Sequence, residues 1–257
     1  MYEKKTVTTF TNATHPSVYE TRFSFDTFGR MLRITYPDGE VVTNTYDSGG
    51  NLRSAEGVKA QAASGQNHRY RYLQGLFYDK FEQRVLVEQG NNVKTAYSYD
   101  AKTRRLNSLT AQKNDGTLFQ NLTYTYDKVG NILNLANNVA VPPPNVFGGP
   151  TNQNFAYDDL YRLTHGDGTF QFSPSKSHTY SMDMVYDTIH NIAVKNQLHT
   201  IIQPSQQAIT QKKTSYNFTY AYNQSGANSV RPHAPTQPGR AKVALAAIIK
   251  RKSGNGP

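Results

Sequence analysis

Seven Asp residues recur in similar surroundings along this chain of 257 residues, at Asp26, Asp47, Asp79, Asp100, Asp127, Asp158 and Asp187. Two carboxylates about 5–10 Å apart can act as acid and base on a glycosidic bond. An Asp at the end of a strand can instead accept hydrogen bonds from backbone N–H groups and start a turn. Because all seven share the same neighbours, the turn interpretation explains every copy at once, and we expect no catalytic residue among them.

The other residue types that carry chemistry are scattered or absent. The chain has no Cys, which excludes disulfides, thiol catalysis and cysteine-ligated metals. Its seven His show neither HExxH nor another metal spacing, and no GxSxG elbow surrounds a Ser. The Gly-flanked stretch His165-Gly166-Asp167 predicts a solvated loop. We therefore expect no metal, no cofactor and no enzymatic activity.

A phrase of about ten residues carries the Asp residues and indicates which elements position them. It has alternating residues that end in an aromatic, then Asp, two variable residues, Gly or its replacement, Asn or Arg, and an aliphatic residue. The best-formed copy is YTYDKVGNIL, from Tyr124 to Leu133. A degenerate eighth copy is YAYNQSGAN, from Tyr220 to Asn228. In the seven clear copies, the aromatic before Asp is Phe25, Tyr46, Tyr78, Tyr99, Tyr126, Tyr157 or Tyr186.

Each phrase predicts a β-hairpin. Alternation places Tyr124 and Tyr126 on one face of a strand, and Asp127 ends that strand by starting a turn. Gly130 follows three residues later, where a type I turn with a bulge requires a positive φ that glycine adopts without strain. Each phrase therefore joins two antiparallel strands.

The other copies and the connections between them fit the same plan. Gly29 and Gly50 take the glycine place in their copies, and we expect Thr103 to take it in YSYDAKTRRL. A loop rich in Pro and Gly, at 142–150, separates the fifth copy from the sixth. Second turns are expected at residues 37–39, 90–91 and 114–116. The fold predicted is all-β, an antiparallel ribbon of hairpins.

Composition limits the function classes. The 18 Tyr and 12 Phe favour β-structure, and we expect cross-strand aromatic pairs to form the sheet core. Of 28 Lys and Arg, nine follow Asp187, whereas none of the 18 acidic residues does, so residues 1–187 carry a net charge of only +1. A specific nucleic-acid surface is therefore not expected. No apolar run approaches the ~20 residues of a membrane span, and the N-terminus lacks the apolar stretch of a signal peptide.

The repeated Tyr-Asp-x-x-Gly-Asn/Arg-x-Leu phrase resembles the YD repeat of Rhs proteins, insecticidal toxin complexes and teneurins. Stretches such as YPDGEVVTNTYDSGGNLRSAEG and YDKVGNILNL are similar to bacterial Rhs cores of the toxin-associated type, and the similarity covers about residues 9–236. The resemblance implies a β-ribbon that spirals into a hollow, non-catalytic shell around a C-terminal toxin. It also implies that the partners are the rest of that shell and its toxin cargo, and that the intact system is secreted or at the cell surface.

The chain departs from the family pattern at its C-terminal end. The family's self-cleavage motif, Asp-Pro-x-Gly-Leu, is absent, so no cleavage residue is carried over. After Thr236 the sequence changes to a stretch without aromatic or acidic residues. We expect a repeat array over residues 1–236, a basic tail over 237–257 that is disordered or a short helix, and an open, truncated segment of a shell.

Two further expectations follow for a segment of this kind. An array without its neighbours leaves an aromatic-rich strand edge unpaired, which predicts self-association. The alternative function is a carbohydrate- or cell-surface-binding module, in which the Tyr and Phe residues form a stacking surface for glycan or for nucleic-acid bases.

Overall fold

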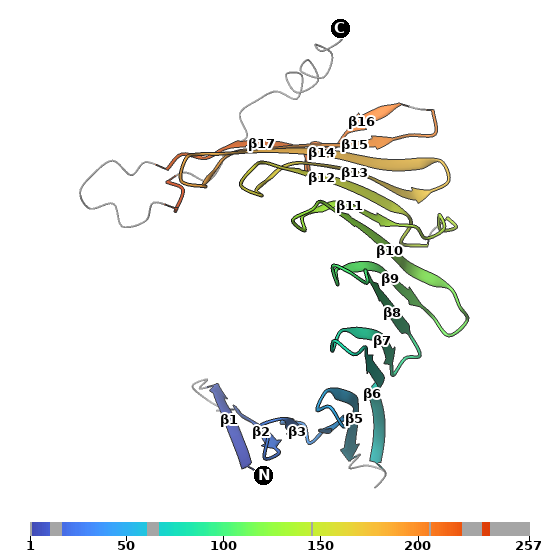
Figure 1. Ribbon diagram of the computed structural model, residues 1–257, viewed down its shortest axis with the longest axis vertical. Coiled ribbons are helices and arrows are strands. Elements are labelled where there is room, and N and C mark those ends of the chain that lie inside the picture. Colours follow the sequence, from blue (N-terminus) through green and yellow to red (C-terminus); the bar gives the residue numbers. More distant parts are fainter. Residues whose placement is uncertain are drawn as a thin grey trace, which may run out of the picture. The chain divides into compact units, whose positions relative to one another are not determined.

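The computed structural model describes residues 2–10, 17–60, 67–144, 146–205, 207–222 and 233–236 (Figure 1). These ranges contain seventeen β-strands and no helix. The expected tail over 237–257 lies outside them, as do His15 and residues 223–228 of the eighth copy. The described residues fall into two compact units.

The first unit comprises residues 1–100 and 109–118. Each strand pairs antiparallel with the next from β1 to β8. These strands are β1 (Tyr2–Phe10), β2 (Ser17–Phe25), β3 (Met31–Thr35), β4 (Val41–Tyr46), β5 (Leu52–Ala60), β6 (Asn67–Tyr78), β7 (Arg84–Gln89) and β8 (Lys94–Tyr99).

The second unit comprises residues 101–108 and 119–257, and β9 (Leu106–Gln112) and β10 (Leu118–Tyr126) contribute residues to both units. Consecutive strands pair antiparallel from β10 to β15, and β16 and β17 both pair with β15. The remaining strands are β11 (Ile132–Asn137), β12 (Thr151–Tyr157), β13 (Leu163–Ser173), β14 (Lys176–Tyr186), β15 (Ile192–Ile202), β16 (Ala208–Thr210) and β17 (Tyr216–Thr219). The predicted all-β, antiparallel ribbon is confirmed.

A β-bulge lies beside the motif aromatic. The pairing register shifts between Thr125 and Tyr126, and the same shift precedes Phe25, Tyr46, Tyr78, Tyr157 and Tyr186. A bulge disturbs the ladder of backbone hydrogen bonds and bends the strand. The phrase therefore encodes a hairpin that has a β-bulge beside its aromatic residue.

Burial in both units is shallow. Among the described residues, the buried hydrophobic side chains are Val42, Leu76 and Ala111, and no side chain is fully buried. A sheet packed against a second layer buries one face of most of its strands. These sheets are instead held mainly by backbone ladders and by contacts between neighbouring strands.

One expectation about the strands was wrong. His165-Gly166-Asp167 lies inside β13 and pairs with β14, not in a loop. The neighbouring Gly168 serves packing, because a Cβ there would come within 2.7 Å of the Tyr180 ring, so the ring lies directly over the backbone.

The aromatic side chains mostly contact neighbours along one strand. Tyr124 and Tyr126 stack with ring centroids 6.3 Å apart on the same strand. Opposite them lie the aliphatic Leu135 and Ile132. The expected cross-strand aromatic pairing occurs at Tyr2 and Phe25, with centroids 4.7 Å apart, but the motif itself pairs an aromatic with an aliphatic residue.

Candidate functional site

The turn after each motif aromatic is closed by its Asp. In the best-formed copy the backbone N–H of Asp127 donates to the carbonyl of Asn131, and Asp127 Oδ1 accepts from the N–H groups of Val129 (3.0 Å) and Asn131 (2.8 Å). The carboxylates of Asp26, Asp79, Asp158 and Asp187 accept in the same way from the residues two and four positions ahead. Each of these carboxylates is used within its own turn.

In all seven copies, the residue at the glycine place of the phrase, which ends the turn, has a positive φ. It is glycine at Gly29, Gly50 and Gly130, with φ between 78° and 112°. In the other four copies it is Glu82, Arg104, Tyr161 or His190, with φ between 60° and 71°. The expectation for Thr103 was therefore wrong, because that turn is one residue longer and Arg104 takes the left-handed conformation.

The motif tyrosine links each copy to the copy before it. The hydroxyl of Tyr126 donates to the main-chain oxygen of Leu106 at 2.8 Å. Leu106 is the first residue of the return strand in the preceding copy. The same bond joins Tyr46 to Met31, Tyr78 to Leu52, Tyr99 to Arg84, Tyr157 to Ile132, Tyr186 to Leu163 and Tyr222 to Ile192.

This tyrosine link explains the choice of Tyr over Phe in the phrase. A buried or half-buried carbonyl next to a bulge needs a donor, and a phenol supplies one at the far end of an apolar ring. Phe25, in the first copy, lacks the hydroxyl and stacks on Tyr2. Tyr222 extends the series to the eighth copy, whose residues 223–228 lie outside the described ranges.

The Asn/Arg position of the phrase forms a second set of links. Arg105 Nη1 donates to the carbonyl of Asp127 at 2.8 Å, which lies in the turn of the next copy. Arg162 reaches the carbonyl of Asp187 at 3.5 Å in the same way. The guanidinium of Arg30 lies 3.1 Å from where a Cβ on Gly50 would be, again in the following turn.

The copies that follow these arginines carry asparagine. Asn51, Asn131 and Asn191 come one copy after Arg30, Arg105 and Arg162. Asn131 and Asn191 each donate from Nδ2 to the carboxylate of their own turn, at 2.7 Å and 2.9 Å. Asn191 Oδ1 also contacts His233 Nδ1 at 2.7 Å. The arginine of one copy therefore lies against the turn of the next copy along the chain, which carries asparagine at the same position. The sequence shows this order as an Arg-then-Asn succession, but the phrase as defined above gives the position only as Asn or Arg.

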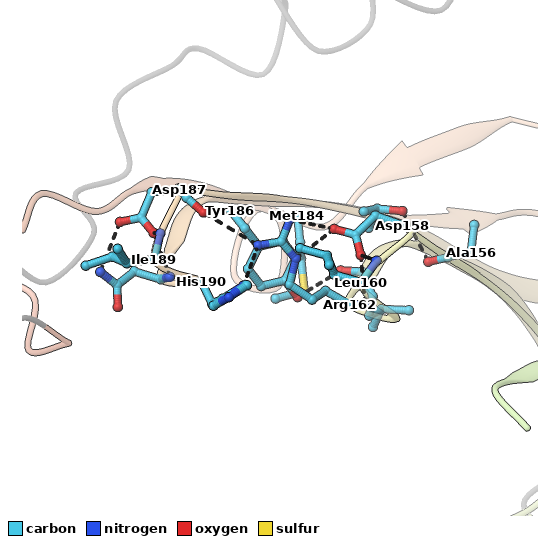
Figure 2. A network of polar contacts seen from close by, with 12 residues as sticks. Ala156, Asp158, Leu160, Arg162, Met184, Tyr186, Asp187, Ile189 and His190 are labelled. Carbon is cyan, nitrogen blue, oxygen red and sulfur yellow. Dashed lines mark hydrogen bonds and ion pairs between the residues drawn. The ribbon is translucent and has the colours of Figure 1, made fainter. Parts of the chain in front are cut away.

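Figure 2 shows one complete link, between the sixth and seventh copies. Arg162 pairs with Asp158 at 2.7 Å, lies 4.6 Å over the ring of Tyr186, and contacts His190 Nδ1 at 3.0 Å. Hydrogen bonds, first from the backbone N–H of Arg162, hold the pKa of Asp158 below its usual value although burial acts against them. Burial raises the pKa of Tyr186, so its phenol remains a donor. The network joins two turns and presents no nucleophile to an open site.

Metal ligation is not supported by the geometry. The described residues contain no group of three or more His, Asp or Glu arranged to hold a metal ion. The predicted site residues of one copy thus contact those of the adjacent copy, and these contacts link the copies structurally. Within the described ranges, no helix is long and apolar enough to cross a membrane.

An open cavity of about 790 Å³ lies in the first unit and was not predicted. Tyr36, Asp38, Glu40 and Tyr72 line it. The hydroxyl of Tyr72 donates to Glu40 Oε1 at 2.5 Å, and this bond raises the pKa of Tyr72 to about 12. Asp38 pairs with Lys59 at 2.6 Å. The cavity therefore combines exposed aromatic rings with carboxylates.

Comparison with known proteins identifies toxin subunits as relatives. No family model matches the chain. Toxin subunit YenC1 of Yersinia entomophaga is 32% identical over 167 residues, which is 60% of this chain and 16% of the relative. Toxin subunit YenC2 of the same organism is 28% identical over 165 residues, or 59% of this chain and 16% of the relative. The chain thus spans about a sixth of the length of these two relatives.

Solved structures share the fold. The crystal structure of TcdB2-TccC3 has a TM-score of 0.62 and 25% identity, and the match covers 80% of this chain and 10% of that chain. The structure of the Photorhabdus luminescens Tc holotoxin pore has a TM-score of 0.60 and 23% identity, and the match covers 82% of this chain and 10% of that chain. The antiparallel repeat sheet is therefore an architecture already seen in toxin complexes.

Proposed function

We propose that this chain, a member of the Rhs and YD-repeat family of toxin-complex proteins, forms part of the wall of a hollow shell that encloses an effector. One observation carries the proposal: the sheets bury few side chains, yet every motif tyrosine among the described copies after the first is tied to the preceding copy. A wall must be continuous and closed to solvent without needing a thick core. Links between neighbouring turns supply continuity in that design.

The partners of such a wall are further repeats of the shell and an enclosed toxin. The wall has no chemistry of its own in this proposal, because its Asp residues are occupied as turn acceptors. The complete assembly acts as a secreted or cell-surface toxin component. The array includes Thr236, whose backbone N–H donates to the carbonyl of Ala221 at 2.9 Å, and we assign residues 237–257 to a separate tail.

A chimera tests the proposal. This chain replaces the matching segment of toxin subunit YenC1, and a protease-sensitive reporter is fused behind the shell. We expect the reporter to survive protease treatment in the chimera and in the unmodified subunit, and to be degraded when the segment is deleted. A folded chimera whose reporter is degraded as fast as in the deletion would contradict the wall role.

The cavity of the first unit favours a second candidate function, binding of glycan. Sugars stack on aromatic rings and hydrogen-bond to carboxylates, and Tyr36, Tyr72, Asp38 and Glu40 offer both. A glycan array should then show binding that Tyr36→Ala abolishes. The matched control is Tyr161→Ala, which removes a Tyr exposed in a turn of the second unit. Equal binding by both variants would exclude the cavity.

Self-association belongs to the proposal as well. Exposed large apolar side chains are numerous on the described residues, and Phe28 and Leu160 are 82% and 58% exposed. A wall segment without its neighbours leaves such side chains in water. We therefore expect the isolated chain to associate with itself.

A further inference from the structure

The second variable residue of the phrase is apolar in successive turns. Val129, Leu160 and Ile189 lie at the tips of three consecutive motif turns of the second unit and are 55%, 58% and 47% exposed. Phe28 takes the same place in the first unit. Figure 2 shows Leu160 and Ile189 in adjacent turns. Hairpin turns are normally polar, because apolar side chains gain nothing from exposure to water.

The turns at the opposite ends of the same strands differ. Their tips carry Pro37-Asp38, Asn114-Asp115, Pro174-Ser175 and Pro204-Ser205. The exception is the long loop between β11 and β12, where Val146 and Phe147 are exposed. Because both sets of turns close hairpins of the same ribbon, hairpin formation does not require apolar tips. Gly49 and Lys102 take this place in two other copies, so the turn itself does not require the apolar residue there either.

The spacing of these tips limits what can bind them. The turns at 127–131, 158–162 and 187–191 follow β10, β12 and β14, so each is two strands from the next. Strands in a sheet are 4.7–4.9 Å apart, which places successive tips roughly 9–10 Å apart. A partner that contacts all three must present apolar groups at that same interval. A sheet built from the same two-strand repeat does so.

We infer that Val129, Leu160 and Ile189, here named the tip row, form the docking surface for a second sheet of the same repeat. For the protein on its own, that sheet is a second copy of this chain. The polar groups beneath the tips are already satisfied, since Asp158 and Asp187 accept their hydrogen bonds within their own turns. Contact through the tip row therefore needs only apolar burial. The inference rests on the proposed wall role only in assuming that repeat sheets adjoin one another.

The absence of Cys makes a site-specific test possible. Leu160→Cys places a unique thiol in the tip row, and Ser175→Cys places one in a turn at the opposite edge. Under mild oxidation we expect Leu160→Cys to form covalent dimers about tenfold faster than Ser175→Cys, because docking raises the local concentration of thiols. Equal rates for the two thiols would overturn the inference.

Sedimentation velocity provides an independent readout. The triple variant Val129→Ser, Leu160→Ser, Ile189→Ser should remain monomeric at concentrations where the unmodified chain associates. The control Val146→Ser, Phe147→Ser removes exposed apolar area from the other edge and should associate as the unmodified chain does. Equal loss in both variants, or a monomeric unmodified chain, would overturn the inference. If the triple variant fails to fold by circular dichroism, the two thiol variants decide, since each changes one exposed residue. The outcome is independent of the protease test of the wall role.

Discussion

The hydroxyl of Tyr126 donates to the main-chain oxygen of Leu106, 2.8 Å away in the preceding copy of the repeat. Tyr124, two residues earlier on the same strand, stacks beside it. Both rings lie on one face of the strand, yet it is Tyr126, beside the bulge, that bonds to the preceding copy. This difference separates the packing role of a motif aromatic from its role as a hydrogen-bond donor.

Tyr126→Phe removes the donor and keeps the ring. We expect the free energy of unfolding to fall by about 1 kcal/mol or somewhat more, because the half-buried carbonyl of Leu106 loses its partner. Urea denaturation measures the change. Tyr124→Phe is the matched control and should cost clearly less. Equal losses would mean that the hydroxyl of Tyr126 adds nothing to the array.

Two features of the structure disfavour a side chain at Gly130, its positive φ and a close neighbour, whereas only the positive φ does so at Gly39. Both have positive φ, but a Cβ on Gly130 would come within 2.8 Å of Arg105 Nη2, whereas nothing lies within 4 Å of one on Gly39. Gly130→Ala should therefore destabilise by more than about 1 kcal/mol, and by more than Gly39→Ala. Thr103→Val should be mild, because the left-handed residue of that turn is Arg104. Thermal melts of the three variants compare them, and the reverse order would contradict the account.

The sequence predicts the repeat well and its connections poorly. The alternation around Tyr126, the turn at Asp127 and the positive φ at Gly130 all follow from local rules, because they involve residues close together in the chain. The bond from Tyr126 to Leu106 spans twenty residues and depends on how the bulge turns the ring. Such a contact is set by the sheet as a whole, which a local pattern does not encode.

The errors have the same origin. Gly166 and Gly168 suggested a loop because glycine is common in turns, but both lie in a strand, and Gly168 lets the Tyr180 ring approach the backbone. Thr103 was misplaced because counting from Asp100 assumes turns of one length. The apolar tips were counted as variable, although Val129 and Leu160 share a property that appears only when their turns are seen at one edge.

Arg162 should matter more than its exposed counterparts. It contacts the carboxylate of its own turn and the next turn, whereas Arg69 forms an exposed pair with Glu56. Arg162→Ala should lower the melting temperature more than Arg69→Ala, since exposed pairs contribute little. Arg162→Lys should recover only part of the loss, because an ammonium lacks the fork that reaches two turns. A full recovery would show that charge alone is required.

Acid should weaken the array through its turn carboxylates. The pKa of Asp158 is lowered, first by the backbone N–H of Arg162, so its ionised form is favoured in the folded state. That stability is present above the unfolded pKa of about 4 and is lost as pH falls through the lower folded value. Asp158→Asn should therefore make the free energy of unfolding less dependent on pH between about 2 and 5. An unchanged pH dependence would contradict the role given to this carboxylate.

Retention of an enclosed reporter tests the wall role most directly. In the chimera with toxin subunit YenC1, the reporter half-life under protease is measured for the unmodified segment and for one carrying Tyr126→Phe, Tyr157→Phe and Tyr186→Phe. A segment with Tyr124→Phe and Tyr180→Phe is the control. We expect a protected reporter with the unmodified and control segments and faster degradation when the three links are removed. A reporter degraded equally fast in all three chimeras, with the segment folded, would contradict it.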